Sequence, residues 1–187
     1  QLGAEPLDPR VILEQELSSY HSTHHSLERL YEEISGNEIL WRSTPTIAPI
    51  EDSSVSSHYG RRRDPFTNLP AFHSGIDFSG PAGTPIYAPA DGIVRKAGPA
   101  AGYGLLVELD HGSGISIKNF KPTDYMTRYG HLSRLAVQAN QFIQRGELLG
   151  YTGNTGRSTR SHLHYEIHAN KRPINPWRNL SHFSISR

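Results

Sequence analysis

Two short patterns in the sequence combine side chains that bind divalent metal ions. In the first, His73-Ser-Gly-Ile-Asp77, an imidazole and a carboxylate stand four residues apart. On a strand, residues i and i+4 share a face, and Gly75 lets the backbone bend so that the two side chains can converge. Imidazole nitrogen and carboxylate oxygen are both zinc donors. Because this spacing is common by chance, the pattern alone permits a metal site but does not establish one.

The second pattern, His162-Leu-His164-Tyr-Glu166, alternates polar and apolar residues. On a strand, this alternation puts His162, His164 and Glu166 on one face and the apolar residues in the core. The two imidazoles would then lie roughly 6–7 Å apart, which is too far for both to bind one ion without distortion. The spacing suits one metal ligand with one neighbouring histidine, and it also fits a polar strand face with hydrogen-bonded histidines.

The numbers of histidines and cysteines restrict which ligands a metal site in this chain can use. The chain has 11 histidines and no cysteine, so any metal site must use imidazole and carboxylate ligands. A third motif, Tyr129-Gly-His131-Leu, adds one more histidine on a predicted strand. A single histidine on a strand usually has a structural role, so His131 gains meaning only beside the other two patterns.

The three patterns, in this order within a turn-rich chain, resemble those of the zinc endopeptidases of the LytM (M23) family. The resemblance extends from about residue 56 to residue 177. His73-Ser-Gly-Ile-Asp77-Phe, with the later Gly83-Thr-Pro-Ile-Tyr-Ala-Pro-Ala-Asp-Gly, resembles the first metal motif of the family and the turn after it. Gly153-Asn-Thr-Gly156 and His162-Leu-His164-Tyr-Glu resemble the last motif.

This resemblance implies that one Zn²⁺ per chain is bound by His73, Asp77 and His164. It also implies that His131 and His162 are the catalytic pair. Two histidines and one carboxylate leave a fourth tetrahedral position for water, and zinc lowers the pKa of that water towards about 7. The catalytic pair could act as general base and as donors to the developing oxyanion. Four further residues are candidates for contact with the substrate or with a metal ligand: Asn68, Tyr129, Arg160 and Glu166.

The sequence departs from the family pattern at Arg160, where the family commonly has glycine. Arg160 puts a positive charge beside the expected cleft, where it could meet a substrate carboxylate. Glu166 could orient an imidazole or be solvated. Asn68 could take the open zinc position if the polar segment before the first motif covers the cleft, which would make the enzyme latent.

By resemblance, the reaction is hydrolysis of an amide bond in the peptide part of bacterial peptidoglycan, in a stem peptide or a cross-link. An extracytoplasmic location, in the periplasm or cell envelope, follows from that substrate. The start at Gln1 fits a longer exported or membrane-anchored precursor. The alternative is a catalytically silent module that binds the wall or activates an amidase. The presence of all five expected ligand and catalytic residues favours the enzyme.

The elements that must position these residues are predicted to be short strands. With 17 Gly, 13 Pro and 35% apolar residues, the composition is typical of a turn-rich all-β chain. The predicted fold is a compact antiparallel β-sheet or small barrel of LytM type. A protruding loop is expected from Ile115 to Thr127, around Pro122. Strands are expected at Gly75–Phe78, Pro85–Tyr87, Gly92–Ala97, Leu105–Asp110, Met126–His131, Leu148–Thr152 and His162–Ile167.

One long helix is predicted before this domain, over residues 1–36. Asp8 is a good N-cap, Pro9 suits the first helical position, and apolar residues recur behind them at heptad spacing. Residues 9–35 would therefore self-associate or pack on the domain. The remaining divisions are a linker over 37–54, a zinc peptidase domain over 55–180 and a C-terminal tail over 181–187.

Charge and hydropathy restrict the partners. Lys and Arg number 19, and Asp and Glu number 18, which leaves a net charge of +1. This balance gives no basic excess for binding nucleic acid. The sequence has no run of about 18 apolar residues, so no transmembrane segment is expected within it. The expected partner is the peptidoglycan peptide.

Overall fold

The computed structural model describes residues 40–180 except residues 52, 117 and 120. The predicted N-terminal helix over 1–36 and the predicted tail over 181–187 lie outside the described residues. Within the described part, no helix is long and apolar enough to cross a membrane.

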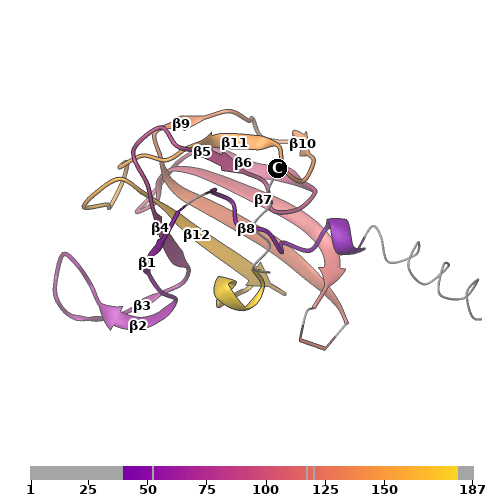
Figure 1. Cartoon of the computed structure of the whole chain (residues 1–187), viewed down its shortest axis with the longest axis horizontal. Helices are drawn as coiled ribbons and strands as arrows, with labels where there is room; N and C mark the ends of the chain where they lie inside the picture. The colour runs from indigo at the N-terminus through magenta and orange to yellow at the C-terminus, as the bar shows by residue number, and fades with distance from the viewer. Residues whose placement is uncertain (1–39, 52, 117, 120, 181–187) are drawn as a thin grey trace, which may run out of the picture. The chain divides into compact units, whose positions relative to one another are not determined.

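Strands make up most of the described chain, as its turns and alternating residues predict. Within this part, eight strands form one sheet in the order β1-β4-β12-β8-β7-β6-β10, with β13 paired to β12 (Figure 1). Neighbouring strands are antiparallel, which confirms the all-β prediction. The strand order begins at β1 and ends at β10, so the described strands form an open sheet and not a closed barrel. The strands are Val55–Ser57 (β1), Ile76–Ser79 (β4), Gly92–Ala100 (β6), Gly104–Ile115 (β7), Pro122–Leu132 (β8), Phe142–Ile143 (β10), His162–Ala169 (β12) and Arg172–Ile174 (β13).

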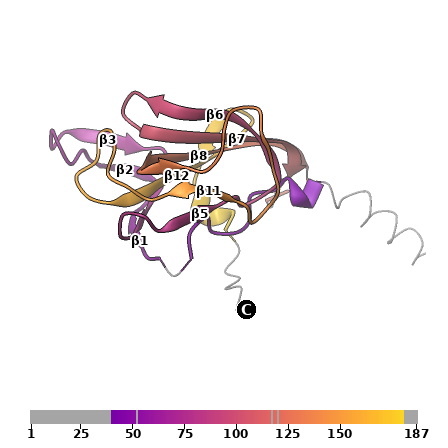
Figure 2. The same ribbon diagram turned by 90° about the horizontal axis from the view of Figure 1, so that it is seen from above.

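Two smaller sheets complete the described fold. The apolar core lies between the large sheet and a three-stranded sheet, because Ile86 and Leu149 of the small sheet belong to one buried cluster with Leu109 and Leu163 of the large one. Figure 2 shows β5 and β11 beside the large sheet. The remaining elements are Pro85–Tyr87 (β5), Arg134–Leu135 (β9) and Leu148–Tyr151 (β11) in the three-stranded sheet, Gly60–Arg63 (β2) and Pro70–His73 (β3) in a hairpin, and the 3₁₀ turn Pro176–Arg178 (η1).

Strand β12 is buried on both faces, and this strand carries the second metal-binding pattern. Its side chains alternate between the core and the opposite face of the sheet, as the sequence predicts. Every residue from position 163 to position 168 is buried. The core face carries Leu163, Tyr165 and Ile167, and the opposite face carries His164, Glu166 and His168.

The predicted loop from Ile115 to Thr127 is too long, because only residues 116–121 lie between the two strands. β7 runs to Ile115 and β8 begins at Pro122, and these two residues are paired across the ladder. Pro122 occupies the first position of its strand, where a proline is tolerated. From Thr123 onward, alternate side chains are buried, which the sequence reading missed because it weighted the proline above this alternation.

Part of the predicted linker packs on the domain. Ile50 belongs to the core cluster, and the side chain of Thr44 is fully buried. The Thr44 hydroxyl oxygen accepts a hydrogen bond of 2.8 Å from the backbone amide of Ile115. A single apolar residue among prolines and serines produces no periodic pattern, so the sequence does not reveal this contact. A domain boundary near position 55 stays a prediction, but the core includes residues before it.

A buried hydrogen-bond chain joins the strands behind the site. His111 Nδ1 donates to the backbone carbonyl of Asp91 at 2.7 Å, and His111 Nε2 lies 2.8 Å from the Thr127 hydroxyl. The Thr127 hydroxyl lies 2.7 Å from that of Tyr129. With Nδ1 protonated, neutral His111 accepts from Thr127, which in turn accepts from Tyr129. Burial disfavours the imidazolium and lowers the pKa of His111 to about 4, although the carbonyl of Asp91 opposes this shift.

This buried histidine predicts a pH dependence of stability. In the unfolded chain His111 has a pKa of about 6.5, so between about pH 6.5 and pH 4 the unfolded state binds a proton that the folded state does not. The free energy of unfolding therefore falls as the pH is lowered through this window. In His111→Gln this decrease should be smaller than in the wild type. Urea unfolding of the wild type and variant at pH 7.5 and pH 5 measures the difference. An unchanged pH dependence in the variant would contradict the assignment.

Candidate metal centre

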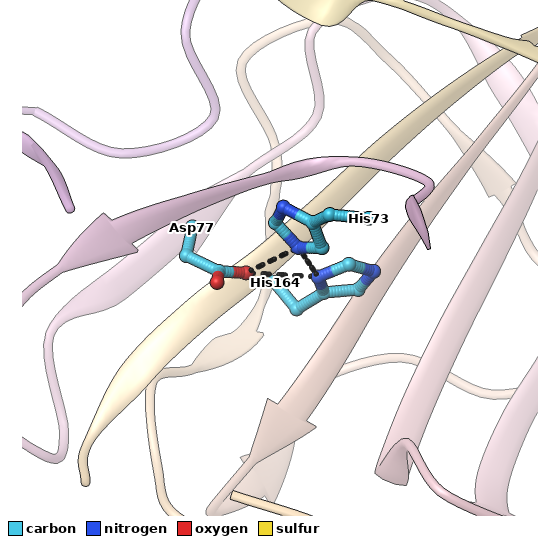
Figure 3. A group of neighbouring side chains, drawn as sticks. All are labelled: His73, Asp77 and His164. Carbon is cyan, nitrogen blue, oxygen red and sulfur yellow. Dashed lines mark hydrogen bonds and ion pairs between the residues drawn. The ribbon is translucent and has the colours of Figure 1, made fainter. Parts of the chain in front are cut away.

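The two sequence patterns meet at one point of the structure. His73 ends β3, Asp77 lies on β4, and the register of β4 with β12 pairs Asp77 with His164. Figure 3 shows the three side chains pointing toward one another. His73 Nε2 lies 3.0 Å from His164 Nδ1 and 3.0 Å from Asp77 Oδ1. His164 Nδ1 lies 2.9 Å from the same oxygen, Asp77 Oδ1.

This geometry fits a metal ion. All three side chains are buried, and one ligand atom from each lies within 4.8 Å of the others. Ligands at tetrahedral angles around zinc, with bonds of 2.0–2.2 Å, are about 3.4 Å apart, so the three donors need to move only slightly to surround an ion.

The hydrogen bonds behind the two histidines leave the right nitrogens free. His73 Nδ1 lies 2.9 Å from the backbone carbonyl of His58, and a carbonyl can only accept, so Nδ1 carries the proton and Nε2 keeps its lone pair. His164 Nε2 lies 2.9 Å from Glu166 Oε1, so here Nε2 carries the proton and Nδ1 is free. Each neutral imidazole therefore directs a lone pair at the point that faces Asp77, as a metal ligand requires.

The electrostatics of this point favour a positive charge. Burial by itself would lower the pKa of His164, but the carboxylates of Asp77 and Glu166 raise it to about 9. Burial would likewise raise the pKa of Asp77, but when protons occupy the two imidazole nitrogens that face it, hydrogen bonds from His164 and His73 hold this pKa far below its usual range. Two carboxylates around one imidazole therefore stabilise a cation here, which a proton or a metal ion can supply.

A buried carboxylate orients His164 from behind. Glu166 is fully buried, and its Oε1 also accepts from the hydroxyls of Ser74 and Tyr103, the latter at 2.8 Å. Its Oε2 accepts from His168 Nε2 at 2.6 Å. Burial would raise the pKa of Glu166, but the bonds from His164 and His168 hold it well below its usual range. Of the two roles left open for Glu166, the geometry favours orientation of an imidazole.

The two further histidines lie side by side next to this centre. The rings of His131 and His162 are 4.7 Å apart between centroids, and His162 Nε2 lies 3.7 Å from Asp77 Oδ1. His131 Nδ1 donates to the carbonyl of Thr155, and His162 Nδ1 donates to that of Arg160, each at 2.8 Å. Nε2 of each neutral ring is therefore left without a proton. Burial lowers the pKa of His131 to about 4, although the bond to Thr155 opposes this shift.

An irregularity in β8 aims His131 at this position. The register between β7 and β8 shifts between the pair Leu105–Leu132 and the pair Val107–Tyr129. Within the shift, His131 has a φ of 65°, a left-handed conformation that is uncommon for residues other than glycine. Bulges of this kind redirect side chains beside active sites. Nothing in the motif around His131 signals the bulge.

One pocket of about 550 Å³ is lined by the three candidate ligands and by both histidines of the pair. Arg160 is at its edge, as expected, and is exposed. Asn68 is exposed at the turn between β2 and β3 and does not line the pocket, and Tyr129 is fully buried in the core. The lining residues are Ser56, Ser57, Arg62, Pro65, Phe66, His73, Ser74, Asp77, Gly102, Tyr103, His131, Arg157, Ser158, Thr159, Arg160, His162 and His164.

Sequence reasoning missed several residues that support the centre. Arg62 belongs to none of the three motifs, but its Nη1 lies 3.3 Å from Asp77 Oδ2 and 2.5 Å from Ser57 Oγ. It thereby holds the carboxylate oxygen that does not face the histidines. Tyr103 and His168, which contact Glu166, carried no signal either, since neither belongs to a spaced motif with a known ligand.

Comparison with known proteins agrees with this geometry. The sequence profile described as peptidase family M23 matches residues 71–176, more than half of the chain. The chain belongs to peptidase family M23. The resemblance seen in the three motifs is therefore confirmed, and the matched range contains the three candidate ligands and the histidine pair.

Two curated relatives that this M23 chain matches are named for peptidases. The DD-carboxypeptidase/endopeptidase Mpg of Neisseria meningitidis serogroup B is 39% identical over 130 residues, which are 70% of this chain and 28% of that protein. The peptidoglycan DD-endopeptidase ShyA of Vibrio cholerae is 41% identical over 122 residues, which are 65% of this chain and 26% of that protein. The chain thus spans about a quarter of the length of the curated relatives that it matches.

Two solved structures extend the comparison to the fold. A zinc containing peptidase from Vibrio cholerae superposes with a TM-score of 0.61 at 29% identity, over 71% of this chain and 39% of that one. The catalytic domain of the antimicrobial peptidase lysostaphin from Staphylococcus simulans superposes with a TM-score of 0.56 at 26% identity. That match covers 68% of this chain and 91% of the lysostaphin domain.

The close approach of Gly75, just before β4, to β12 predicts that a larger residue at this position destabilises the fold. A Cβ on Gly75 would lie 2.2 Å from the backbone oxygen of Tyr165. Gly75→Ala must therefore push the two strands apart, and we expect the free energy of unfolding to fall by about 1–3 kcal/mol. Urea unfolding in the presence of a chelator measures this loss without a contribution from metal.

Gly80 provides a matched control for this substitution. A Cβ there would find its nearest neighbour at 3.5 Å, an ordinary contact, so Gly80→Ala should leave stability almost unchanged. Equal stability of the two alanine variants would contradict the role assigned to Gly75.

Proposed function

We propose that this chain is a zinc-dependent endopeptidase that hydrolyses peptide bonds in peptidoglycan, in stem peptides or in their cross-links. The observation that carries the proposal is the convergence of three metal donors with free lone pairs, beside two histidines in one pocket. Membership of family M23 and the names of the relatives support the substrate class. An extracytoplasmic location, in the periplasm or cell envelope, belongs to the same proposal because peptidoglycan is found there.

In this proposal His73, Asp77 and His164 hold one Zn²⁺ per chain. The donor set is that of zinc hydrolases, with two imidazoles and one carboxylate. A zinc ion held there would supply Lewis acidity, which would lower the pKa of an attacking water molecule and polarise the scissile carbonyl. Arg62 contacts the outer oxygen of Asp77, and Glu166 contacts the outer nitrogen of His164, so both ligands are kept in the orientation that the ion needs.

His131 and His162 act on the reacting groups. Backbone carbonyls hold the Nδ1 proton of each ring, so neither imidazole can rotate without losing a hydrogen bond. Each ring offers Nε2, which accepts a proton when neutral and donates one when protonated. One imidazole of the pair takes the proton of the attacking water, and the other stabilises the oxyanion that develops on the carbonyl.

A catalytically silent module that binds the wall or activates an amidase is the alternative. Such a module needs neither a set of metal donors nor a pair of preoriented imidazoles. Because this chain has both, within one pocket, the enzyme is the function that the geometry supports best.

Metal content and the histidine pair provide the direct test. We expect purified protein to carry one zinc ion per chain, and we expect chelation to stop the release of fragments from purified peptidoglycan until zinc is restored. His131→Ala and His162→Ala should each lower kcat by about 10²- to 10⁴-fold, the range for loss of acid–base assistance, while keeping the metal. Elemental analysis and mass spectrometry of the released fragments measure both quantities.

His58→Ala is the matched control for these variants. This side chain is exposed, and only its backbone carbonyl contacts His73, so the substitution should change neither zinc content nor turnover. Absence of stoichiometric zinc would contradict the proposal that the protein is a zinc enzyme. Full activity in both histidine variants would contradict the catalytic roles proposed for His131 and His162.

The buried carboxylate behind His164 predicts a change in metal affinity. Glu166→Gln retains the size of the side chain but removes its charge, so His164 becomes a weaker and less firmly oriented ligand. We expect the dissociation constant for zinc to rise about 10- to 100-fold, as found for other groups that orient metal ligands. Competition with a chromophoric zinc chelator measures the constant without reference to activity.

Glu108→Gln separates this effect from a general loss of charge. Glu108 pairs with Arg128, which also lies near Glu166, but Glu108 itself has no bond to a candidate ligand. Its substitution should leave zinc affinity within about twofold of the wild type, a difference of less than 0.5 kcal/mol. Equal affinities of the two variants would show that Glu166 does not orient His164.

A further inference from the structure

The pocket beside the histidine pair is lined by positive charge. Three arginines reach it, namely Arg62, Arg157 and Arg160. Among the described residues, Asp77 is the only carboxylate in its lining, and that carboxylate is already shared between the two candidate histidine ligands. A pocket of this composition attracts an anionic group on the molecule that enters it.

Two of the three arginines are already paired within the protein. Arg62 bonds to Ser57 and Asp77, as described above. Arg157 Nη2 lies 2.7 Å from Asp64 Oδ1, and its guanidinium carbon lies 4.7 Å from the centre of the Phe66 ring. The Arg157 contacts join the β2–β3 hairpin to the loop between β11 and β12, and the Arg62 contacts join the same hairpin to β1 and β4. Neither guanidinium is therefore available without breaking its contacts.

Arg160 is the arginine that remains available. Its side chain is exposed, and among the described residues its guanidinium has no hydrogen bond or ion pair. Its backbone, by contrast, is firmly held, because the Arg160 carbonyl accepts from His162 Nδ1 and from Ser158 Oγ, each at 2.8 Å. The bond that orients His162 therefore also fixes the origin of the Arg160 side chain. An anion bound by Arg160 would lie in the same pocket as the histidine pair.

We propose that Arg160 binds a free carboxylate next to the scissile amide and thereby selects among peptidoglycan cross-links, an inference that rests on the proposed endopeptidase function. The planar guanidinium matches a carboxylate with two parallel hydrogen bonds. A cross-link made to the distal amine of a diamino dicarboxylic acid leaves free the carboxylate on the carbon that bears this amine, directly beside the amide. A bridge of glycines within the main chain has no such group. Arg160 therefore favours the first class of bond.

Two synthetic cross-linked peptides test this proposal. They are identical except that the carbon bearing the cross-linked amine carries a free carboxylate in one and a primary carboxamide in the other. For the zinc-loaded wild type we expect kcat/KM to be about 5- to 20-fold higher for the carboxylate peptide. This is the effect of one charge-assisted hydrogen bond whose strength is reduced because Arg160 is exposed to solvent. Arg160→Gln should lose this preference mainly through the carboxylate peptide, and Arg160→Lys should retain part of it.

Arg172→Gln is the matched control. This exposed arginine lies on β13, opposite the end of β12 that is distant from His162, so its loss should leave the preference intact. Zinc content and thermal melting of each variant confirm that the centre and the fold are unchanged. Because Arg160 is exposed and its contacts are made by its backbone, both Arg160 variants should pass these checks.

The outcomes separate the two levels of the proposal. Equal kcat/KM for the two peptides with wild-type protein would overturn the role of Arg160 and leave the endopeptidase in place. A preference that survives in Arg160→Gln would overturn it as well, because another group would then read the carboxylate. Failure of the wild type to cut either peptide, or purified peptidoglycan, would overturn the proposed function and the inference with it.

Discussion

The antiparallel pairing of β4 with β12 is the constraint on which the rest of the site depends. It places Asp77 directly opposite His164, and a shift of one residue would turn Asp77 to the other face of the sheet. Gly75 permits the pairing because its missing side chain lets β4 lie against the backbone of Tyr165. His73, at the end of the preceding hairpin, then reaches the same point. Backbone geometry thus brings together three donors that the chain separates by 91 residues between His73 and His164.

Burial of charge imposes a second constraint, and it links stability to chemistry. A fully buried carboxylate such as Glu166 is costly unless its oxygens accept hydrogen bonds. Ser74, Tyr103, His164 and His168 supply these bonds. The bond from His164 also fixes which of its nitrogens carries the proton. The fold therefore cannot bury Glu166 satisfactorily without also preparing His164 to bind a cation.

The three arginines of the pocket show how one residue type serves three physical roles. Arg62 steadies the outer oxygen of Asp77, which leaves the inner oxygen facing the histidines. Arg157, through Asp64, connects the β2–β3 hairpin with the loop before β12. Arg160 is held only by its backbone, so its charge remains exposed to whatever enters the pocket. Whether each arginine supports the structure or binds a substrate is therefore decided by the contacts of its guanidinium, more than by the total charge of the pocket.

The strands around the motifs could be predicted from the sequence alone, because alternation within one strand decides which residues share a face. The candidate ligands followed from the resemblance of the motifs to those of a known family, since His73 and Asp77 lie on different strands. Longer-range contacts could not be predicted. His131 reaches His162 through a bulge that depends on the pairing of β8 with β7, and Arg62 meets a metal ligand on a different strand. Ile50 enters the core from a segment without periodicity. The sequence determined which groups could bind a metal, whereas only the tertiary structure decided which nitrogens are free and which charges are paired, because those properties belong to neighbours far away in the chain.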